Sequence, residues 1–297
     1  MSRRPRLRTF GSLASAAVAV ALLVPAGVAA QARTVETATL GPVTAELSYV
    51  KHSRRSGGFR FVEYRDFRVR IQRNGQVLYD KPIGKPCEQF CTPTDSVLTR
   101  AHIGLAELNG DSEFEVIVDL FTGGANCCVL VHAFGFDPVA NTYRRARLDT
   151  GGGFVARDYP PRDEVTELVG DDFRFRGLFT CGACGSRPLR IWHYTLSGFE
   201  VVTRSFPEQI RVHARRMKRI YERVRHRRDA PVFVKGALTP YAADLCLLDR
   251  CGEGFRLVRV AIRRGELDRR SLFDVPPHGR AYLRALKRFL RRTGYLR

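Results

Sequence analysis

Residues 189–224 decide the fold class of this chain. They read LRIWHYTLSGFEVVTRSFPEQIRVHARRMKRIYERV, and the spacing of their apolar side chains changes at Phe206-Pro207. Before this point, the short runs 189–194 and 199–203 have the pattern that predicts β-strands. After it, apolar side chains recur at steps of four and three residues, which predicts an amphipathic helix. These side chains are Ile210, Ala214, Met217, Tyr221 and Val224.

The chain before this boundary is predicted to be rich in strands, because short β-like runs alternate with turn residues from residue 38 to about residue 203. The strongest turn signal is Asn74-Gly75, which lies between the apolar runs 69–71 and 77–79. A type I′ hairpin turn needs two residues that tolerate positive φ, so this dipeptide predicts a hairpin. Further candidate strands are 43–50, 67–71, 115–121 and 129–136.

The chain after the boundary is predicted to be helical. Thr239-Pro240 offers an N-cap and a first-turn proline, which predicts that a second helix begins there and continues to Cys251-Gly252. A last helix is predicted over about 277–293. Its inward-facing side chains are expected to be Tyr282, Leu286, Phe289 and Leu290.

These patterns predict an α+β fold with three parts. Residues 1–32 have the features of a secretory signal peptide, followed by a β-rich module over 33–203 and a basic helical segment over 204–297. The alternative for the first part is an uncleaved anchor, but its apolar stretch is shorter than the ~20 residues of a membrane span. We therefore expect a secreted protein. The signal features are Arg3, Arg4, Arg6 and Arg8, the apolar stretch 13–24, and the A-x-A pattern of Ala30 and Ala32.

Basic residues are concentrated at one end of the chain. The formal net charge is +20, and 44% of the residues are hydrophobic, enough for a buried core. Residues 33–203 hold 21 basic and 21 acidic side chains, whereas residues 204–297 hold 25 basic and 9 acidic ones. One interpretation is a helical cap with a solvated arginine-rich face. The other is a surface for a polyanion, such as an anionic cell-envelope polymer, acidic lipid head groups or extracellular nucleic acid.

Specific recognition of a nucleic acid is not predicted. Aromatic residues such as Tyr221 and Phe289 fall on the apolar faces of the predicted helices and not among the arginines, so they are not placed to stack on bases. A polyanion would then be bound through charge.

The eight cysteines form four close pairs, which in an exported chain predict disulfides. The simplest pairing has three local bridges: Cys87–Cys91, Cys181–Cys184 and Cys246–Cys251. A bridge between the adjacent Cys127 and Cys128 would be strained, so each of them can instead bond to another pair. The C-x-x-C spacing of residues 181–184 also leaves a redox site or half of a zinc site open.

Residues 107–115, ELNGDSEFE, place oxygen-bearing side chains at positions 1, 3, 5 and 9 of a tight loop. Such spacing points alternate side chains inward, and calcium takes about six to eight oxygen ligands. The loop is therefore a candidate calcium site, and its alternative is a solvated turn that binds no ion. The candidate ligands are Glu107, Asn109, Asp111 and Glu115.

The same loop, followed by residues 116–120 (VIVDL), resembles the D-x-[DN]-x-D-G-x-x-D loop of FG-GAP/VCBS-type repeats. The resemblance implies propeller-blade-like antiparallel strands with calcium held between two of them. This chain departs from the pattern at Glu107, where the family has Asp, and at Ser112, where it usually has Gly. A shift of 49 residues aligns 115–116 with 164–165, but two partial copies cannot close a propeller. Residues 118–128 also resemble a group of exported bacterial proteins, which implies no activity.

No catalytic residues are predicted. The sequence has no H-E-x-x-H pair, no G-x-S-x-G elbow and no phosphate-binding glycine loop followed by lysine. The first hypothesis is thus an exported, non-catalytic binding or surface-interaction protein. The second is a secreted enzyme, a hydrolase by class, with a dispersed active site that a cleft with convergent carboxylates or histidines would reveal.

Overall fold

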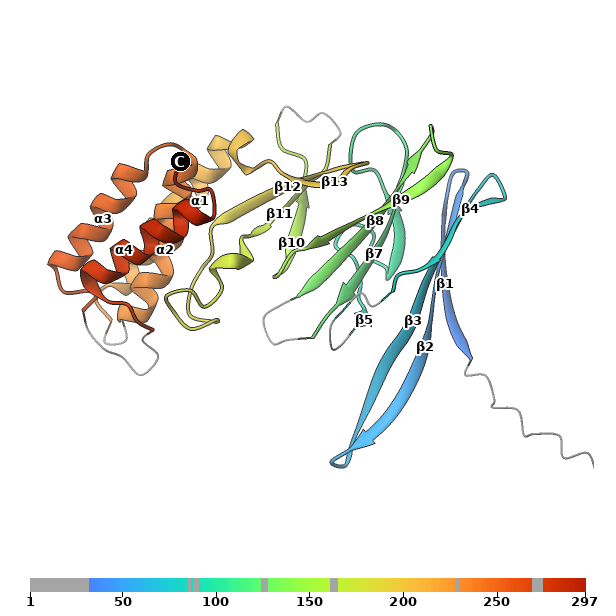
Figure 1. The fold of residues 1–297 in the computed structure, drawn as a ribbon, viewed down its shortest axis with the longest axis horizontal. Coiled ribbons are helices and arrows are strands. Elements are labelled where there is room, and N and C mark those ends of the chain that lie inside the picture. Colours follow the sequence, from blue (N-terminus) through green and yellow to red (C-terminus); the bar gives the residue numbers. More distant parts are fainter. Residues whose placement is uncertain are drawn as a thin grey trace, which may run out of the picture. The chain divides into compact units, whose positions relative to one another are not determined.

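The computed structural model describes residues 32–84, 87, 91–123, 128–160, 165–227, 230–268 and 275–297. The predicted signal peptide lies outside them apart from its last residue. Residues 32–297 form one compact unit, and within its described residues three antiparallel sheets precede four α-helices (Figure 1). The prediction of an α+β fold is confirmed.

The first sheet is a run of hairpins in the order β1-β2-β3-β4. Asn74 and Gly75 have φ of 50° and 78°, as a type I′ turn requires, and the predicted hairpin joins β3 to β4. Alternate residues of β2, among them Ala45 and Leu47, are fully buried, because successive side chains of a strand face opposite sides of the sheet. The strands are β1 (Arg33–Leu40), β2 (Val43–Ser56), β3 (Phe59–Arg73) and β4 (Gln76–Pro82).

The second sheet lies between two hydrophobic cores. Val116 and Val118 of its strand β7 pack against the first sheet, whereas Ile117 packs against the third. A strand that is buried on both faces has a nearly continuous apolar sequence, which explains why residues 115–121 are predicted as a strand. The strands are β5 (Thr92–Pro93), β6 (Ile103–Ala106), β7 (Glu115–Phe121), β8 (Val129–Asp137) and β9 (Thr142–Asp149).

The third sheet joins the β-rich part to the helices. Leu168 and Trp192 face the second sheet, and Val169 and Ile191 pack on the other side against Ile210. Within the described residues the three sheets do not close into a propeller. The strands, in the order β10-β11-β12-β13, are β10 (Phe154–Arg157), β11 (Glu167–Asp171), β12 (Leu189–Thr195) and β13 (Gly198–Val201).

The helices follow β13 after a short 3-10 turn, η2 (Thr203–Ser205), and a similar turn, η1 (Phe173–Phe175), precedes β12. All five residues of the predicted stripe on the first helix are buried, as are the four predicted inward-facing residues of the last. Both helices are therefore confirmed. The helices are α1 (Pro207–Val224), α2 (Ala230–Leu247), α3 (Cys251–Arg263) and α4 (Gly279–Arg292).

The prediction that a helix begins at Thr239-Pro240 is wrong, because α2 begins at Ala230 and contains Pro240 in its interior. A proline removes the hydrogen bond to the carbonyl four residues earlier, here that of Gly236. That carbonyl accepts instead from the backbone N–H of Ser186, at 3.2 Å, so the proline leaves no unpaired acceptor. Thr239, the supposed N-cap, makes a 2.8 Å hydrogen bond between its hydroxyl and that of Tyr282.

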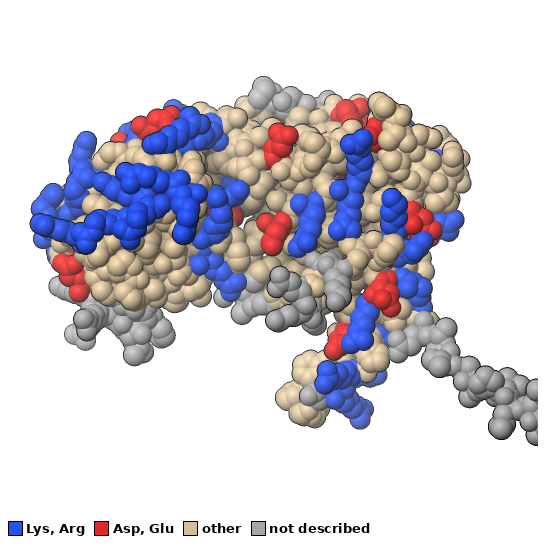
Figure 2. All heavy atoms as spheres, viewed as in Figure 1, with Lys and Arg blue, Asp and Glu red and all other residues tan. Residues whose placement is uncertain are grey.

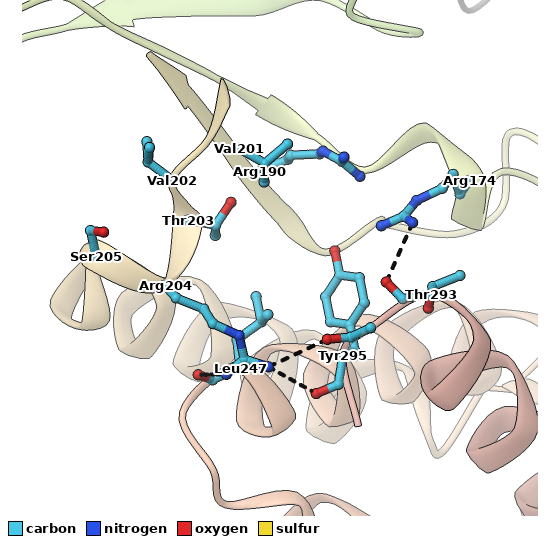
Figure 3. Close-up of a pocket in the computed structure, with 11 residues that line it drawn as sticks. Arg174, Arg190, Val201, Val202, Thr203, Arg204, Ser205, Leu247, Thr293 and Tyr295 are labelled. Atoms are coloured by element: carbon cyan, nitrogen blue, oxygen red, sulfur yellow. Dashed lines mark hydrogen bonds between the residues drawn. The ribbon is translucent and has the colours of Figure 1, made fainter. Parts of the chain in front are cut away.

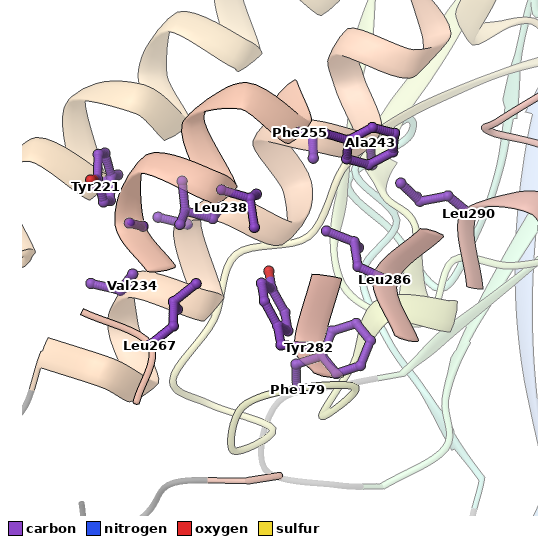
Figure 4. Packing of buried hydrophobic residues seen from close by; sticks show 14 of the residues in the cluster. Phe179, Tyr221, Val234, Leu238, Ala243, Phe255, Leu267, Tyr282, Leu286 and Leu290 are labelled. Atoms are coloured by element: carbon purple, nitrogen blue, oxygen red, sulfur yellow. The ribbon is translucent and has the colours of Figure 1, made fainter. Parts of the chain in front are cut away.

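The helical core surrounds α2 (Figure 4). Its side chains Val234, Leu238 and Ala243 contact residues of the other three helices, so α2 is apolar around most of its circumference and shows no helical period in the sequence. No helix in the part of the chain that the structure describes is long and apolar enough to cross a membrane.

All three local disulfides that the cysteine spacing predicts are present. Cys87–Cys91, Cys181–Cys184 and Cys246–Cys251 have Cα–Cα distances of 5.6, 5.0 and 4.2 Å. They are consistent with an exported protein. These bridges use the other six cysteines, so the expectation that Cys127 and Cys128 can each bond to another pair is wrong. Cys127 itself lies outside the described residues.

The bridge between Cys181 and Cys184 closes a loop that rests on α2. A Cβ atom on Gly236 would lie 2.8 Å from the Cys184 carbonyl oxygen and 2.8 Å from the Gly185 Cα. Glycine is thus required for the contact that lets Ser186 satisfy the Gly236 carbonyl.

We expect Gly236→Ala to lower the free energy of unfolding by about 1–3 kcal/mol, because the loop must move away and leave the carbonyl unpaired. Chemical denaturation measures this loss. The matched control is Gly252→Ala in α3, where a Cβ atom meets nothing within 4 Å, and where helix propensity favours alanine. Equal stability of the Gly236 variant and the wild type would refute the role of this contact.

Candidate functional site

The predicted calcium loop connects β6 to β7 and is held by hydrogen bonds to its own backbone. Glu107 Oε1 accepts from the N–H groups of Asn109 and Gly110, at 3.0 and 2.8 Å. Asn109 Oδ1 accepts from the N–H of Asp111 at 3.3 Å, and Asp111 Oδ1 accepts from that of Glu113 at 2.8 Å. Each of these oxygens therefore already serves the turn.

Glu115, the last of the four candidate ligands, is buried at the base of this loop with 1% of its surface exposed. Its Oε2 accepts from the backbone N–H of Leu108 at 3.0 Å. Burial raises the pKa of Glu115 to about 8, and the nearby charges of Glu107 and Asp111 add to the rise. The structure thus brings three of the predicted carboxylates close enough to influence one another.

The fit of this loop to calcium is partial. Glu107 Oε2 is buried and has no hydrogen-bond partner, as expected of an oxygen that coordinates a cation when one is bound. Among the described residues, no three His, Cys, Asp or Glu side chains are grouped so that they could hold a metal ion. The calcium site stays a prediction. In the second partial copy of the motif, Glu164 lies outside the described residues.

An arginine-lined pocket of about 380 Å³ lies where the third sheet meets the helices (Figure 3). Arg174 and Arg190 point toward each other above the ring of Tyr295, and Arg204 lies below them. A second hollow of about 310 Å³ shares Arg174 and Arg190 and adds Arg147. We call the three arginines of the first pocket, Arg174, Arg190 and Arg204, the junction arginines.

The carboxylate of Asp172, only 1% exposed, holds two of the junction arginines in place. Its oxygens accept from Arg174 Nη2 at 2.6 Å, from Arg190 Nη1 at 2.7 Å and from the hydroxyl of Tyr295 at 2.9 Å. Burial alone would raise the pKa of Asp172, but these hydrogen bonds and the two positive charges lower it below its usual value. Asp172 is therefore an anion at neutral pH and neutralises one of the two arginines.

Arg204 is fixed by backbone carbonyls at helix ends. It donates to Leu247 O at 2.7 Å, at the end of α2, and to Tyr295 O at 3.1 Å, just after α4. Cations are favoured at such ends because the last carbonyls of a helix are unpaired and carry partial negative charge. Its other neighbour, Asp249, is 3.6 Å away and largely exposed, so the pocket keeps a positive charge.

The junction arginines have donors left for an anion. The side chains of Arg174, Arg190 and Arg204 stay 45%, 21% and 26% exposed, and one internal carboxylate faces two guanidinium groups there. Guanidinium groups bind carboxylate, phosphate or sulfate oxygens through paired hydrogen bonds. The aspartates of the second hollow are already engaged: Asp171 with Arg187 at 3.0 Å, and Asp149 with the N–H of Gly151 at 2.9 Å.

The helices carry a second basic surface (Figure 2). In α4 four of the five exposed arginines follow steps of four, four and three residues along one face, and the helix contains no acidic residue. No ion pair in the described part of the chain involves any of them. We call these residues the α4 stripe: Arg280, Arg284, Arg288 and Arg291.

The neighbouring helix α3 extends this surface. Arg256, Arg259 and Arg263 are exposed at steps of three and four residues. The two helices share the core, and Lys287 of α4 lies with its ammonium 4.9 Å from the ring centre of Phe255 in α3. Part of the charge excess counted in the sequence is thus arranged as rows of arginine on two neighbouring helices.

Sequence reasoning found the basic helices and missed the junction arginines. The latter lie one each on η1, β12 and η2, without a helical or strand period between them, and two of the three belong to the part whose charges balance, so neither spacing nor local charge marks them. Comparisons with protein-family models, with curated proteins and with solved structures found no match to this chain.

Glu115 should make stability depend on pH. Its pKa rises from 4.5 to about 8 on folding, so the folded state binds more protons than the unfolded state between these values. Stability should therefore fall as pH rises toward 8, by at most about 1.4 kcal/mol per pH unit for one proton.

His132 opposes this effect only at lower pH, because burial lowers its pKa from 6.5 to about 3. Burial also raises the pKa of Asp119 to about 7, and this group adds to the fall in stability below that pH. The window in which Glu115 is the group that titrates is hence from pH 7 to 8. Denaturation in chelator across this window should show a slope that Glu115→Gln flattens, whereas the exposed control Glu200→Gln should keep it. An unchanged slope in the Glu115 variant would contradict the assignment.

The calcium prediction has its own test, a thermal melt in millimolar calcium and then in chelator. A ligand at a hundred times its Kd stabilises the folded state by about 2.7 kcal/mol, so a real site should raise the midpoint by several degrees. Asp111→Ala should abolish this rise, and the exposed control Glu200→Ala should retain it. Identical midpoints in calcium and chelator would make the loop an ordinary turn.

Proposed function

We propose that this protein is an exported, non-catalytic binding protein that holds an anionic polymer on its helical segment. The observation that carries the proposal is the α4 stripe, four exposed arginines on one face of a helix without an acidic residue. Like charges four residues apart destabilise a helix by a few tenths of a kcal/mol per pair. An anionic partner would neutralise the four arginines and so remove the repulsion between them.

The geometry of the stripe favours a repeating anion over a single one. Four residues of α-helix rise about 6 Å, so successive arginines present charges at regular intervals over about 16 Å. A polymer with a charge on each repeat unit can contact several of them at once. Binding of this kind depends on salt, because it releases condensed counterions.

The junction arginines lie beyond the C-terminal end of α4. Residues 293–295 line their pocket and follow directly on the stripe, which ends at Arg291. An anionic group of a polymer bound on α4 can therefore enter the pocket, where it meets Arg174 and Arg190. The pocket adds directional hydrogen bonds to a contact that is otherwise electrostatic.

Export is supported by the signal-peptide pattern and by the three disulfides.

We also propose a relation to FG-GAP/VCBS-type repeats, with propeller-blade-like strands and calcium. Its support is that the acidic loop lies between two paired antiparallel strands, β6 and β7, as the family pattern implies.

The test compares binding of fluorescent dextran sulfate and of neutral dextran to residues 32–297. The triple variant Arg280→Gln, Arg284→Gln, Arg288→Gln should weaken binding to the sulfated polymer by about tenfold or more at low salt. The dependence of log K on log salt should become shallower by roughly two to three.

The control carries the same charge change on exposed residues of the β-rich part: Lys81→Gln, Arg100→Gln and Arg157→Gln. It should bind almost as the wild type does. Salt-independent binding, or an equal loss in both triple variants, would contradict the proposal.

A further inference from the structure

Strands β2 and β3 continue beyond the sheet that holds them. β1 pairs with β2 only as far as Val50, and β4 pairs with β3 only from Arg68 onward. Residues 51–64, which we call the hairpin extension, therefore form a ribbon of two strands, and no other described strand pairs with it (Figure 1). With six paired residues on each strand at about 3.3 Å per residue, the ribbon is about 20 Å long.

The tip of the hairpin extension is a two-residue turn in open space. Gly57 and Gly58 have φ of 58° and 82°, the pair of positive values that a type I′ turn needs. A Cβ atom on either glycine would meet nothing within 4 Å. Isolated two-stranded hairpins are marginally stable in water, so this ribbon gains from any surface that covers it.

Large apolar side chains lie next to this tip. Phe59 is 71% exposed, Phe61 51% and Val62 39%. Phe59 and Phe61 are two residues apart on one strand, so both project from the same face of the ribbon. Every other phenylalanine of the described residues is buried or half-buried, which makes two adjacent exposed ones a feature to explain.

The flanks of the tip are basic. Between Glu46 and Glu63 the chain contains no acidic residue. Arg55 and Arg60 are directly opposed across the ribbon, a pairing of like charges that is destabilising by itself. No ion pair within the described residues involves Arg55, Arg60 or the exposed Arg54.

We propose that the hairpin extension docks the protein on an anionic membrane surface. Phe59 and Phe61 enter the boundary between head groups and acyl chains, and Arg54, Arg55 and Arg60 bind the lipid phosphates. An amphipathic element penetrates this boundary by about 5–10 Å, which corresponds to two or three strand residues and thus to the part that carries the two phenylalanines.

The combination of groups selects this partner. A soluble polyanion would neutralise the arginines but offers no apolar phase for the phenylalanines. A second copy of this chain, meeting tip to tip, would cover the phenylalanines but would bring the arginines of both copies together. Only an anionic lipid surface meets both needs, since it presents phosphates above hydrocarbon.

This inference concerns a different surface from the α4 stripe and does not rest on the polymer-binding proposal. Every measurement uses residues 32–297, a compact unit without the apolar stretch 13–24, so that this stretch cannot itself bind the vesicles. Variants of the hairpin extension and of the α4 stripe then separate the two surfaces. The probes are vesicles of phosphatidylglycerol mixed with phosphatidylcholine and vesicles of phosphatidylcholine alone.

Flotation should recover the protein with the phosphatidylglycerol vesicles and not with the neutral ones. The variant Phe59→Ser, Phe61→Ser should bind at least about tenfold more weakly. Arg54→Gln, Arg55→Gln, Arg60→Gln should bind of the order of a hundredfold more weakly. Val139→Ser removes an apolar side chain that is 95% exposed elsewhere, and it should bind as the wild type does.

Insertion is measured with Phe59→Trp. The single tryptophan, Trp192, is 4% exposed in the core, so a change of emission on vesicle binding reports residue 59. The emission should shift to shorter wavelength and be quenched by brominated acyl chains. No shift, or vesicle binding that the serine variant retains, would overturn the inference.

Two further outcomes would also overturn it. Vesicle binding that the α4 triple variant abolishes and the hairpin variants keep would assign the lipid contact to the helices. A concentration-dependent dimer that Phe59→Ser, Phe61→Ser dissociates, without vesicle binding by the wild type, would make the ribbon a contact between two copies.

Discussion

The buried carboxylate of Asp172 is the constraint on which the arrangement of this protein depends. It follows β11 and binds arginines of η1 and β12 together with the hydroxyl of Tyr295 near the C-terminus. A charge that is 1% exposed is stable only when it is paired and hydrogen-bonded, so the β-rich part and the end of the helical segment must stay together. The same pairing places Arg174 and Arg190 at the mouth of the pocket.

A second buried acid reinforces this junction. Asp244 of α2 is fully buried and accepts from His213 Nδ1 of α1 at 2.6 Å and from the backbone N–H of Leu189 at 3.3 Å. Burial raises the pKa of Asp244, and the hydrogen bond and charge of His213 act against that rise. One side chain thus connects two helices to β12. The helical segment has 9 acidic residues against 25 basic ones, and Asp244 is used inside, so the helical face is left strongly positive.

The sequence predicts the parts of the fold whose signal is local. The stripe of α1, the Asn74-Gly75 turn and the short cysteine spacings each depend on neighbouring residues, and all three are confirmed. The start of α2 is not predictable in this way, because Pro240 has the local appearance of a first-turn residue. Its tolerance in the interior depends on Ser186, which is far away in the chain and close in space.

The basic surfaces also differ in how far the sequence predicts them. The α4 stripe can be read from sequence as a charge excess and a helical period. The junction arginines cannot, because η1, β12 and η2 bring them together only after the third sheet has packed on α1. The exposure of Phe59 and Phe61 cannot be predicted from the sequence either. Their alternation with Arg60 is the pattern of a strand with one buried face, and both are exposed because no other described strand pairs with this part of the hairpin.

The substitution Asp172→Asn tests the dependence on this carboxylate most directly. Denaturant unfolding can be followed by the fluorescence of Trp192 in the third sheet and by the circular dichroism of the helices. The wild type should show one transition with both probes. The variant should lose about 3 kcal/mol, because two guanidinium groups lose their buried counter-charge, and its two probes should separate as the sheet and the helices uncouple. An unchanged stability with coincident transitions would show that the junction does not depend on Asp172.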